Sequence, residues 1–208
     1  MSRQVMPTPQ LDTGSPAEKR DEIRRYFQTT WELYEDLFSV MAGDQAYVTR
    51  ADPLRHPLIF YLGHTAVFFI NKLVLAKHVT ERVNPRFESI FAIGVDEMSW
   101  DDLDETNYDW PPVAEVWAYR QKVRDLVDRV IDELPLQLPI GWDEPFWTIL
   151  MGCEHERIHL EASSVLIRPL PLDLLRASEA WPGCTRQGDA PSYGLGRGPA
   201  SRVWVGGV

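Results

Sequence analysis

The sequence contains few cysteines, few basic residues and no long apolar run, and each shortage excludes a class of protein. Its two cysteines, Cys153 and Cys184, are too few for a disulfide framework, so a reducing compartment is expected. The 21 basic residues are outnumbered by 31 acidic ones, and the net charge of −10 argues against a nucleic-acid partner, which requires a basic surface. The N-terminus has no apolar signal segment and no run of about 18 apolar residues occurs, so neither secretion nor a membrane span is expected. These absences indicate a cytoplasmic protein.

Four stretches of the sequence have the apolar spacing of long α-helices. The expected helices cover residues 15–41, 57–77, 111–134 and 143–168. Ser15-Pro16-Ala17-Glu18 forms a capping box at the start of the first, and prolines bound the third and fourth. Four helices of this length predict an all-α four-helix bundle, a fold whose facing side chains commonly hold metal ions.

The two ends of the sequence lack this helical pattern. Residues 1–14 hold two prolines and little apolar content, and we interpret them as a flexible leader. Residues 182–208 contain seven of the 13 glycines and end in a short β-like alternation. Because a single strand is not stable alone, we interpret residues 177–208 as an irregular tail: a linker and the first strand of a truncated second domain. The bundle is thereby assigned to residues 15–176.

Two of the five histidines, His155 and His159, lie four residues apart on the fourth expected helix. Residues at this spacing are about 40° apart around the helix axis, with Cβ atoms about 5–6 Å apart, so both imidazoles can reach one metal ion. The same face carries small and apolar side chains, which marks it as the inward face. Two histidines on a buried stripe indicate a metal site.

The third candidate ligand is His64, at the centre of the apolar stripe of the second expected helix. The adjacent Gly63 permits another backbone to approach closely. A single histidine on an apolar face is more often a core residue than a metal ligand. Because the pair His155 and His159 needs a third ligand, the ligand interpretation of His64 becomes the favoured one. His56 and His78, at the two ends of the same helix, are weaker candidates.

Three histidine ligands leave part of the coordination sphere of a metal ion open, which is typical of catalytic or substrate-binding sites. Imidazole suits iron, zinc, copper and nickel alike, so the ligand type does not choose the metal. A closed structural zinc site would need a fourth ligand, usually cysteine, and Cys153 is expected to point away from His155. The sequence therefore favours an open site.

Two other metal motifs match part of the same helix. Residues 155–159 spell the zinc-protease pattern H-E-x-x-H, but Ala162 and Val165 replace the Gly and His of its longer form. The downstream Glu ligand of another protease class could only be Glu179, which lies in an irregular stretch. Residues 156–159 supply one E-x-x-H of a ferritin-like di-iron bundle, which requires a second copy that this sequence lacks. Both motifs are weaker explanations than a three-histidine site.

Two acidic features are not expected to bind the metal. Residues 96–110 contain seven acidic residues and no basic residue, but they do not have the residue spacing of a calcium-binding loop. They form either a solvated acidic loop or, given their aromatic residues, a loop that packs against or docks onto another surface. Glu161 is about 200° around the helix from His159, so we expect it to contact another helix instead.

Three separated segments of the sequence resemble the ovothiol-biosynthesis sulfoxide synthases (5-histidylcysteine sulfoxide synthases). They are residues 55–66, residues 94–102 and the H-x-x-x-H-x-E stretch at 155–161, within a resemblance that covers about residues 18–176. Ergothioneine synthases share the fold and the metal pattern but less of the surrounding sequence. The resemblance implies a DinB-like four-helix bundle in which His64, His155 and His159 hold a non-haem Fe(II).

The resemblance also implies an activity, in which cysteine sulfur is joined to the imidazole carbon of histidine and oxidised to a sulfoxide with O₂. Such enzymes continue into a sulfatase-modifying-factor-like domain that supplies much of the substrate pocket and a catalytic tyrosine. No catalytic residue is therefore assigned in this chain, which is expected to bind metal without appreciable synthase activity. Two alternatives stay open: a DinB-like thiol transferase or hydrolase that uses zinc or nickel, and a non-catalytic docking bundle.

Overall fold

The computed structural model describes residues 6–92 and 109–178, which form a bundle of long helices. The α-helices in these residues are α1 (Pro16–Phe38), α2 (Asp44–Val48), α3 (Leu58–Leu75), α4 (Pro85–Ile90), α5 (Val113–Glu133) and α6 (Pro145–Ile167). A short 3-10 turn, η3 (Leu172–Leu174), follows α6. The described part of the chain contains no β-strand, so the predicted all-α class is confirmed.

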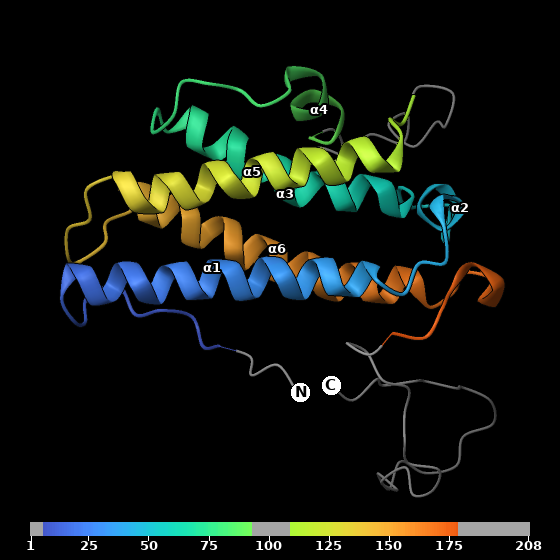
Figure 1. Ribbon diagram of the computed structural model, residues 1–208, viewed down its shortest axis with the longest axis horizontal. Coiled ribbons are helices and arrows are strands. Elements are labelled where there is room, and N and C mark those ends of the chain that lie inside the picture. The colour runs from blue at the N-terminus through green and yellow to red at the C-terminus, as the bar shows by residue number, and fades with distance from the viewer. Residues whose placement is uncertain (1–5, 93–108, 179–208) are drawn as a thin grey trace, which may run out of the picture.

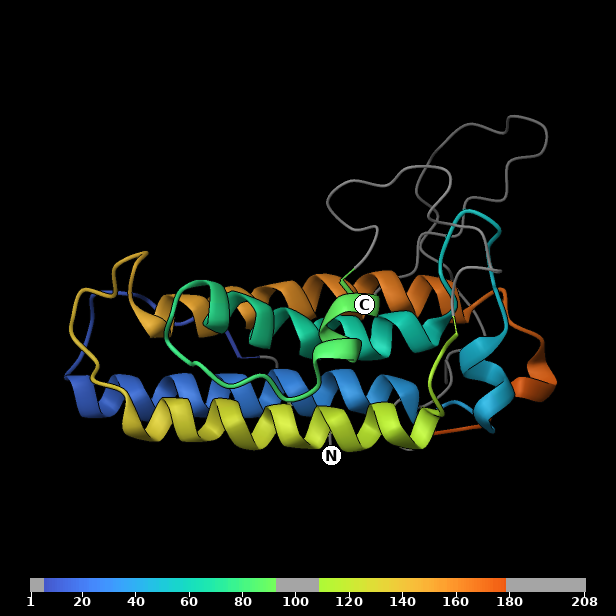
Figure 2. The same ribbon diagram turned by 90° about the horizontal axis from the view of Figure 1, so that it is seen from above.

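The four long helices are arranged in a ring in the order α1, α6, α3, α5, each packed against its two neighbours. Figures 1 and 2 show α3 beside α6 and α1 beside α5, with the short α4 on the outside of α3. These are the four helices predicted from the apolar spacing, and their ends lie within a few residues of the predicted ones. The ring makes α3 and α6 direct neighbours, so side chains of these two helices meet along their contact.

Side-chain caps fix where two of the helices begin. At the start of α1 the Ser15 hydroxyl accepts a hydrogen bond from the Glu18 amide, and the Glu18 carboxylate accepts one from the Ser15 amide, which confirms the predicted capping box. The short helix α4 was not predicted, since it lies between the second and third expected helices. It begins by the same device: the Asn84 side chain caps the helix and Pro85 occupies its first turn.

The helix α3 is the most deeply buried element of the bundle. By length and composition it is apolar enough to cross a membrane, although the sequence shows no continuous apolar run, since Gly63, His64 and Lys72 interrupt it. Within the bundle 72% of this helix is buried by the other elements. Its apolar character is therefore accounted for by its position as a core helix.

Two glycines allow unusually close packing around α3. A Cβ atom at Gly152 of α6 would lie 2.3 Å from the ring of Phe69 on α3. A Cβ atom at Gly63 of α3 would lie 2.6 Å from the ring of Phe91, which follows α4. Both glycines lie within three residues of a candidate histidine ligand, so they determine how closely the site-bearing segments approach.

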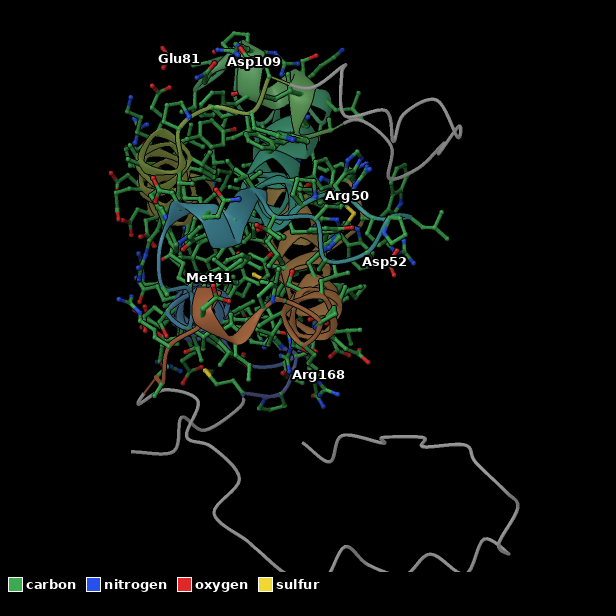
Figure 3. The ribbon with its side chains drawn as sticks, turned by 90° about the vertical axis from the view of Figure 1, so that its right-hand side faces the viewer. Met41, Arg50, Asp52, Glu81, Asp109 and Arg168 are labelled. Carbon is green, nitrogen blue, oxygen red and sulfur yellow. The ribbon has the colours of Figure 1, made fainter. Side chains whose placement is uncertain are left out.

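Segments before α1 and after α6 return to the bundle. Residues 6–11 of the expected leader contact α6 and its preceding loop, since the Met6 carbonyl accepts from Arg157 and the Leu11 carbonyl from the Ile140 amide. After η3, Leu175 pairs with Met41, which lies just past the end of α1, through an isolated β-bridge. Figure 3 labels Met41 at this end of the bundle. Residues 1–5 and 179–208 lie outside the described residues, so the proposed leader, linker and truncated strand stay predictions.

Candidate metal centre

Three histidines from two helices meet at the α3–α6 contact. The Nε2 atom of His155 lies 3.2 Å from the Nε2 atom of His64 and 3.2 Å from that of His159. One ligand atom from each of the three residues lies within 4.8 Å of the other two. The structure thus brings together the three side chains selected from the sequence, and their binding of a metal ion stays a prediction.

The spacing of these nitrogen atoms fits a single metal ion. Two nitrogen atoms that each lie about 2.1 Å from one ion are about 3.2 Å apart when the angle between them is about 100°. The separations of 3.2 Å on both sides of His155 match this geometry. Three imidazoles without a carboxylate or thiolate form a neutral donor set, which suits iron, zinc, copper or nickel.

The orientation of His64 is fixed by a backbone carbonyl. Its Nδ1–H donates a hydrogen bond of 2.6 Å to the carbonyl oxygen of Phe91. Because a carbonyl only accepts, the proton of the neutral ring belongs on Nδ1 and the lone pair on Nε2 faces the other two imidazoles. This is the outer contact that metal-ligating histidines usually make.

Aromatic side chains from α3 cover the three imidazoles. Phe60 stacks on the His64 ring at a centroid distance of 5.1 Å, and Phe68 stacks on the His155 ring at 3.7 Å. The ring of Tyr61 lies 5.8 Å from that of His159. Only 5% of His64 and 9% of His159 is exposed, whereas His155 is partly exposed.

Burial keeps two of the imidazoles neutral in the metal-free chain. It lowers the pKa of His155 from 6.5 to about 2, with further contributions from His159, His64 and Lys72. Burial and the nearby His64 lower the pKa of His159 to about 4. A neutral imidazole with its lone pair available is the form that binds metal ions, so the site is prepared for a metal at neutral pH.

The metal-free chain is expected to lose stability as the pH falls from about 6.5 toward about 4. Unfolded histidine takes up a proton near pH 6.5, whereas folded His155 and His159 resist protonation until about pH 2 and about pH 4. The unfolded state then binds more protons, so this contribution is complete above pH 6.5 and declines below it. Urea midpoints at pH 7.5 and 5.0 in EDTA measure the loss, and the double variant His155→Gln/His159→Gln should lose less. Equal losses would contradict the assignment.

The remaining candidate residues lie away from this cluster. His56 is buried against Phe60, at a centroid distance of 4.4 Å, and His78 follows the end of α3. Cys153 is a buried free thiol whose pKa burial raises well above its usual value. Glu161 is exposed and makes no ion pair with any residue in the described ranges, so its expected contact with another helix is not seen. Residues 93–108, most of the acidic loop, lie outside the described residues.

A buried polar cluster next to the histidines was missed by the sequence analysis. We name it the Arg120 cluster; it comprises Arg120, Glu156, Thr65, Glu35 and the backbone carbonyl of Leu62. Arg120 and Glu156 are both 0% exposed, and their ion pair is 2.8 Å long. The sequence does carry one signal for this cluster. Around the helix axis, Arg120 projects between Val113 and Val116, on the apolar stripe of its helix, and a charge buried there requires a partner.

Comparison with known proteins relates the bundle to a described family. The family model of the DinB superfamily matches residues 26–163. Ergothioneine biosynthesis protein 1 of Neurospora crassa is 25% identical to the chain over 144 residues, which are 65% of the chain. The chain covers only 16% of the length of that relative. The matched residues 26–163 run from α1 into α6 and include all three histidines of the cluster.

Proposed function

The chain belongs to the DinB superfamily, and from this we propose that it is the non-haem Fe(II) domain of a sulfoxide synthase. In the proposed reaction the sulfur of cysteine is joined to the imidazole carbon of histidine with O₂, as in ovothiol biosynthesis. The thiol and ring hydrogens are lost, one oxygen atom of O₂ enters the sulfoxide and the other leaves as water. We further propose that the protein acts in the cytoplasm and that a sulfatase-modifying-factor-like domain completes the substrate pocket.

The observation that carries this proposal is the convergence of three imidazoles from α3 and α6. The two Nε2 separations that involve His155, 3.2 Å each, are those of ligands that share one ion, and a His–His–His set leaves further positions open. The relative from Neurospora crassa is named for ergothioneine biosynthesis, which supports a sulfur-transfer role. The segments that resemble ovothiol synthases are the reason for proposing cysteine and histidine as the substrates.

The residues of this chain would bind and orient the metal and keep water from one side of it. His64, His155 and His159 would hold the ion, and the Phe91 carbonyl would keep the His64 ring in its binding orientation. When bound, Fe(II) would supply the redox chemistry with O₂ and would lower the pKa of a substrate thiol. Because three neutral ligands leave the charge of the ion uncompensated, a thiolate substrate is favoured over a neutral one.

A second function uses the same site without redox chemistry. The all-nitrogen donor set also suits zinc and nickel, which favours a metal-dependent thiol transferase or hydrolase as the alternative. The two functions differ in the metal that the chain retains and in whether it consumes O₂. A non-catalytic docking bundle would show neither property.

The purified chain is expected to retain about one iron per chain when it is expressed with iron supplementation and kept reduced. Because it covers 16% of its relative, we expect binding of Fe(II) without sulfoxide formation at ordinary turnover. Metal content is measured by elemental analysis, O₂ uptake with an oxygen electrode, and product formation by mass spectrometry with cysteine and histidine. Retention of zinc or nickel in place of iron would favour the alternative function. A chain that retains no metal would refute both functions.

A further inference from the structure

The Arg120 cluster connects the two helices that carry the histidines, at the level of the histidines themselves. On the α3 side, one terminal nitrogen of Arg120 donates to the Leu62 carbonyl at 3.1 Å and to the Thr65 hydroxyl at 2.8 Å. These two acceptors lie two residues before and one residue after His64. Arg120 therefore holds the segment of α3 that presents the third imidazole.

On the α6 side, the other terminal nitrogen of Arg120 donates to Glu156 at 2.8 Å, and Glu156 directly follows His155. The Thr65 hydroxyl donates to the same carboxylate oxygen at 3.3 Å. Arg120, Thr65 and Glu156 thus form a closed triangle between α5, α3 and α6. Because the guanidinium group is planar and its donors have a fixed geometry, the triangle fixes the distance between the two helices.

The guanidinium itself is held in place from α1. Its Nε atom donates to Glu35 at 3.1 Å, and its central carbon lies 4.2 Å from the centre of the Trp31 ring. A second α1 residue also connects the two site helices. The Tyr34 hydroxyl donates to the Tyr61 carbonyl of α3 at 2.9 Å and lies 3.2 Å from the Ser163 hydroxyl of α6. With these contacts Arg120 has no freedom to adjust if α3 and α6 move.

From these contacts we propose that the Arg120 cluster is a positioning device that sets the separation of the metal-binding imidazoles of α3 and α6. This inference rests on the metal binding of the proposed function. Stability alone does not account for the cluster, because well-packed apolar side chains of similar volume usually replace a buried ion pair at no cost. Apolar contacts lack the direction of hydrogen bonds, and direction is what holds one helix at a fixed position along another.

The test compares metal affinity with fold stability in the full chain. In the double variant Arg120→Met/Glu156→Met the two fully buried charges are removed together. Glu35, whose side chain is 26% exposed, keeps the hydrogen bond of 2.7 Å from the Trp31 ring nitrogen. Co(II) is the probe, because its visible absorption reports coordination geometry. We expect thermal unfolding within a few degrees of the parent chain, a dissociation constant for Co(II) raised about tenfold, and a shifted absorption band. The control Arg124→Gln removes the Arg124–Glu32 ion pair between α5 and α1 and should bind Co(II) as the parent does. Neither residue makes a hydrogen bond or ion pair with the described residues of α3 or α6.

The outcomes separate this inference from the proposed function. A folded double variant that binds Co(II) within twofold of the parent, with an unchanged absorption band, overturns the positioning role alone. A parent chain that binds no Co(II) overturns the proposed function and this inference with it. If the double variant does not fold, Thr65→Val decides, since it removes a single hydroxyl of the triangle. Binding weakened several-fold in a folded Thr65→Val chain supports the proposal, and unchanged binding refutes it.

Discussion

The His155→Ala chain is expected to lose stoichiometric binding of Fe(II) and Co(II), with the dissociation constant raised at least about a hundredfold. His155 is the shared member of the cluster, because its Nε2 atom lies 3.2 Å from both other Nε2 atoms. Without it, His64 and His159 remain as two ligands on different helices. A metal at a hundred times its dissociation constant stabilises the parent chain by about 2.7 kcal/mol, and the variant should gain at most about 0.4 kcal/mol at the same metal concentration.

Thermal unfolding with and without Co(II) measures this difference directly. The matched control is His78→Ala, which removes a histidine that lies just beyond the end of α3 and outside the cluster. The control should keep the metal-induced increase in unfolding temperature. If the His155→Ala chain kept that increase, or if the control lost it, the three-histidine assignment would be wrong.

The Gly152→Ala chain is expected to be destabilised by about 1–3 kcal/mol and to bind metal more weakly. The added methyl group would lie 2.3 Å from one atom of the Phe69 ring and 2.5 Å from another. Phe69 is fully buried and packs against Phe27 and Trp31, so its ring cannot swing aside. The α6 backbone must therefore move away from α3, one turn before His155.

Urea unfolding and a Co(II) titration measure the two effects separately. Gly43→Ala is the matched control, because a Cβ atom there would have no neighbour within 4 Å and the backbone is extended. The control should change stability by less than about 1 kcal/mol and leave metal binding as it is. Equal stabilities for the two variants would show that the α3–α6 contact is looser than the packing of Phe69 implies.

The long helices and the histidine trio could be predicted because both depend on local periodicity. The apolar spacing of 113–130 defines α5, and the four-residue spacing of His155 and His159 determines that they share a face. The short helix α4 could also have been predicted, since Asn84-Pro85 has the same capping signal as Ser15-Pro16.

Other features of the site depend on contacts between distant segments and leave no local pattern. The carbonyl that orients His64 belongs to Phe91, 27 residues away, and any residue at that position would offer the same carbonyl. The pairing of Arg120 with Glu156 differs, because it leaves an incomplete signal in the sequence. Each charge on an apolar stripe signals that a partner exists, but the sequence does not indicate which helix supplies it.

The contacts of residues 6–11 have a practical consequence for trimming the protein. The Thr8 hydroxyl donates to Glu154 at 3.1 Å, and the Met6 carbonyl accepts from Arg157 at 3.0 Å, so this segment supports the outer side of α6 on either side of His155. A truncation that starts at the first residue of α1 would remove that support and leave the Tyr26 hydroxyl as the hydrogen-bond partner of both side chains. A tag or protease site placed within residues 6–11 would therefore disturb α6, the helix that carries His155 and His159. Expression boundaries are best drawn before Met6.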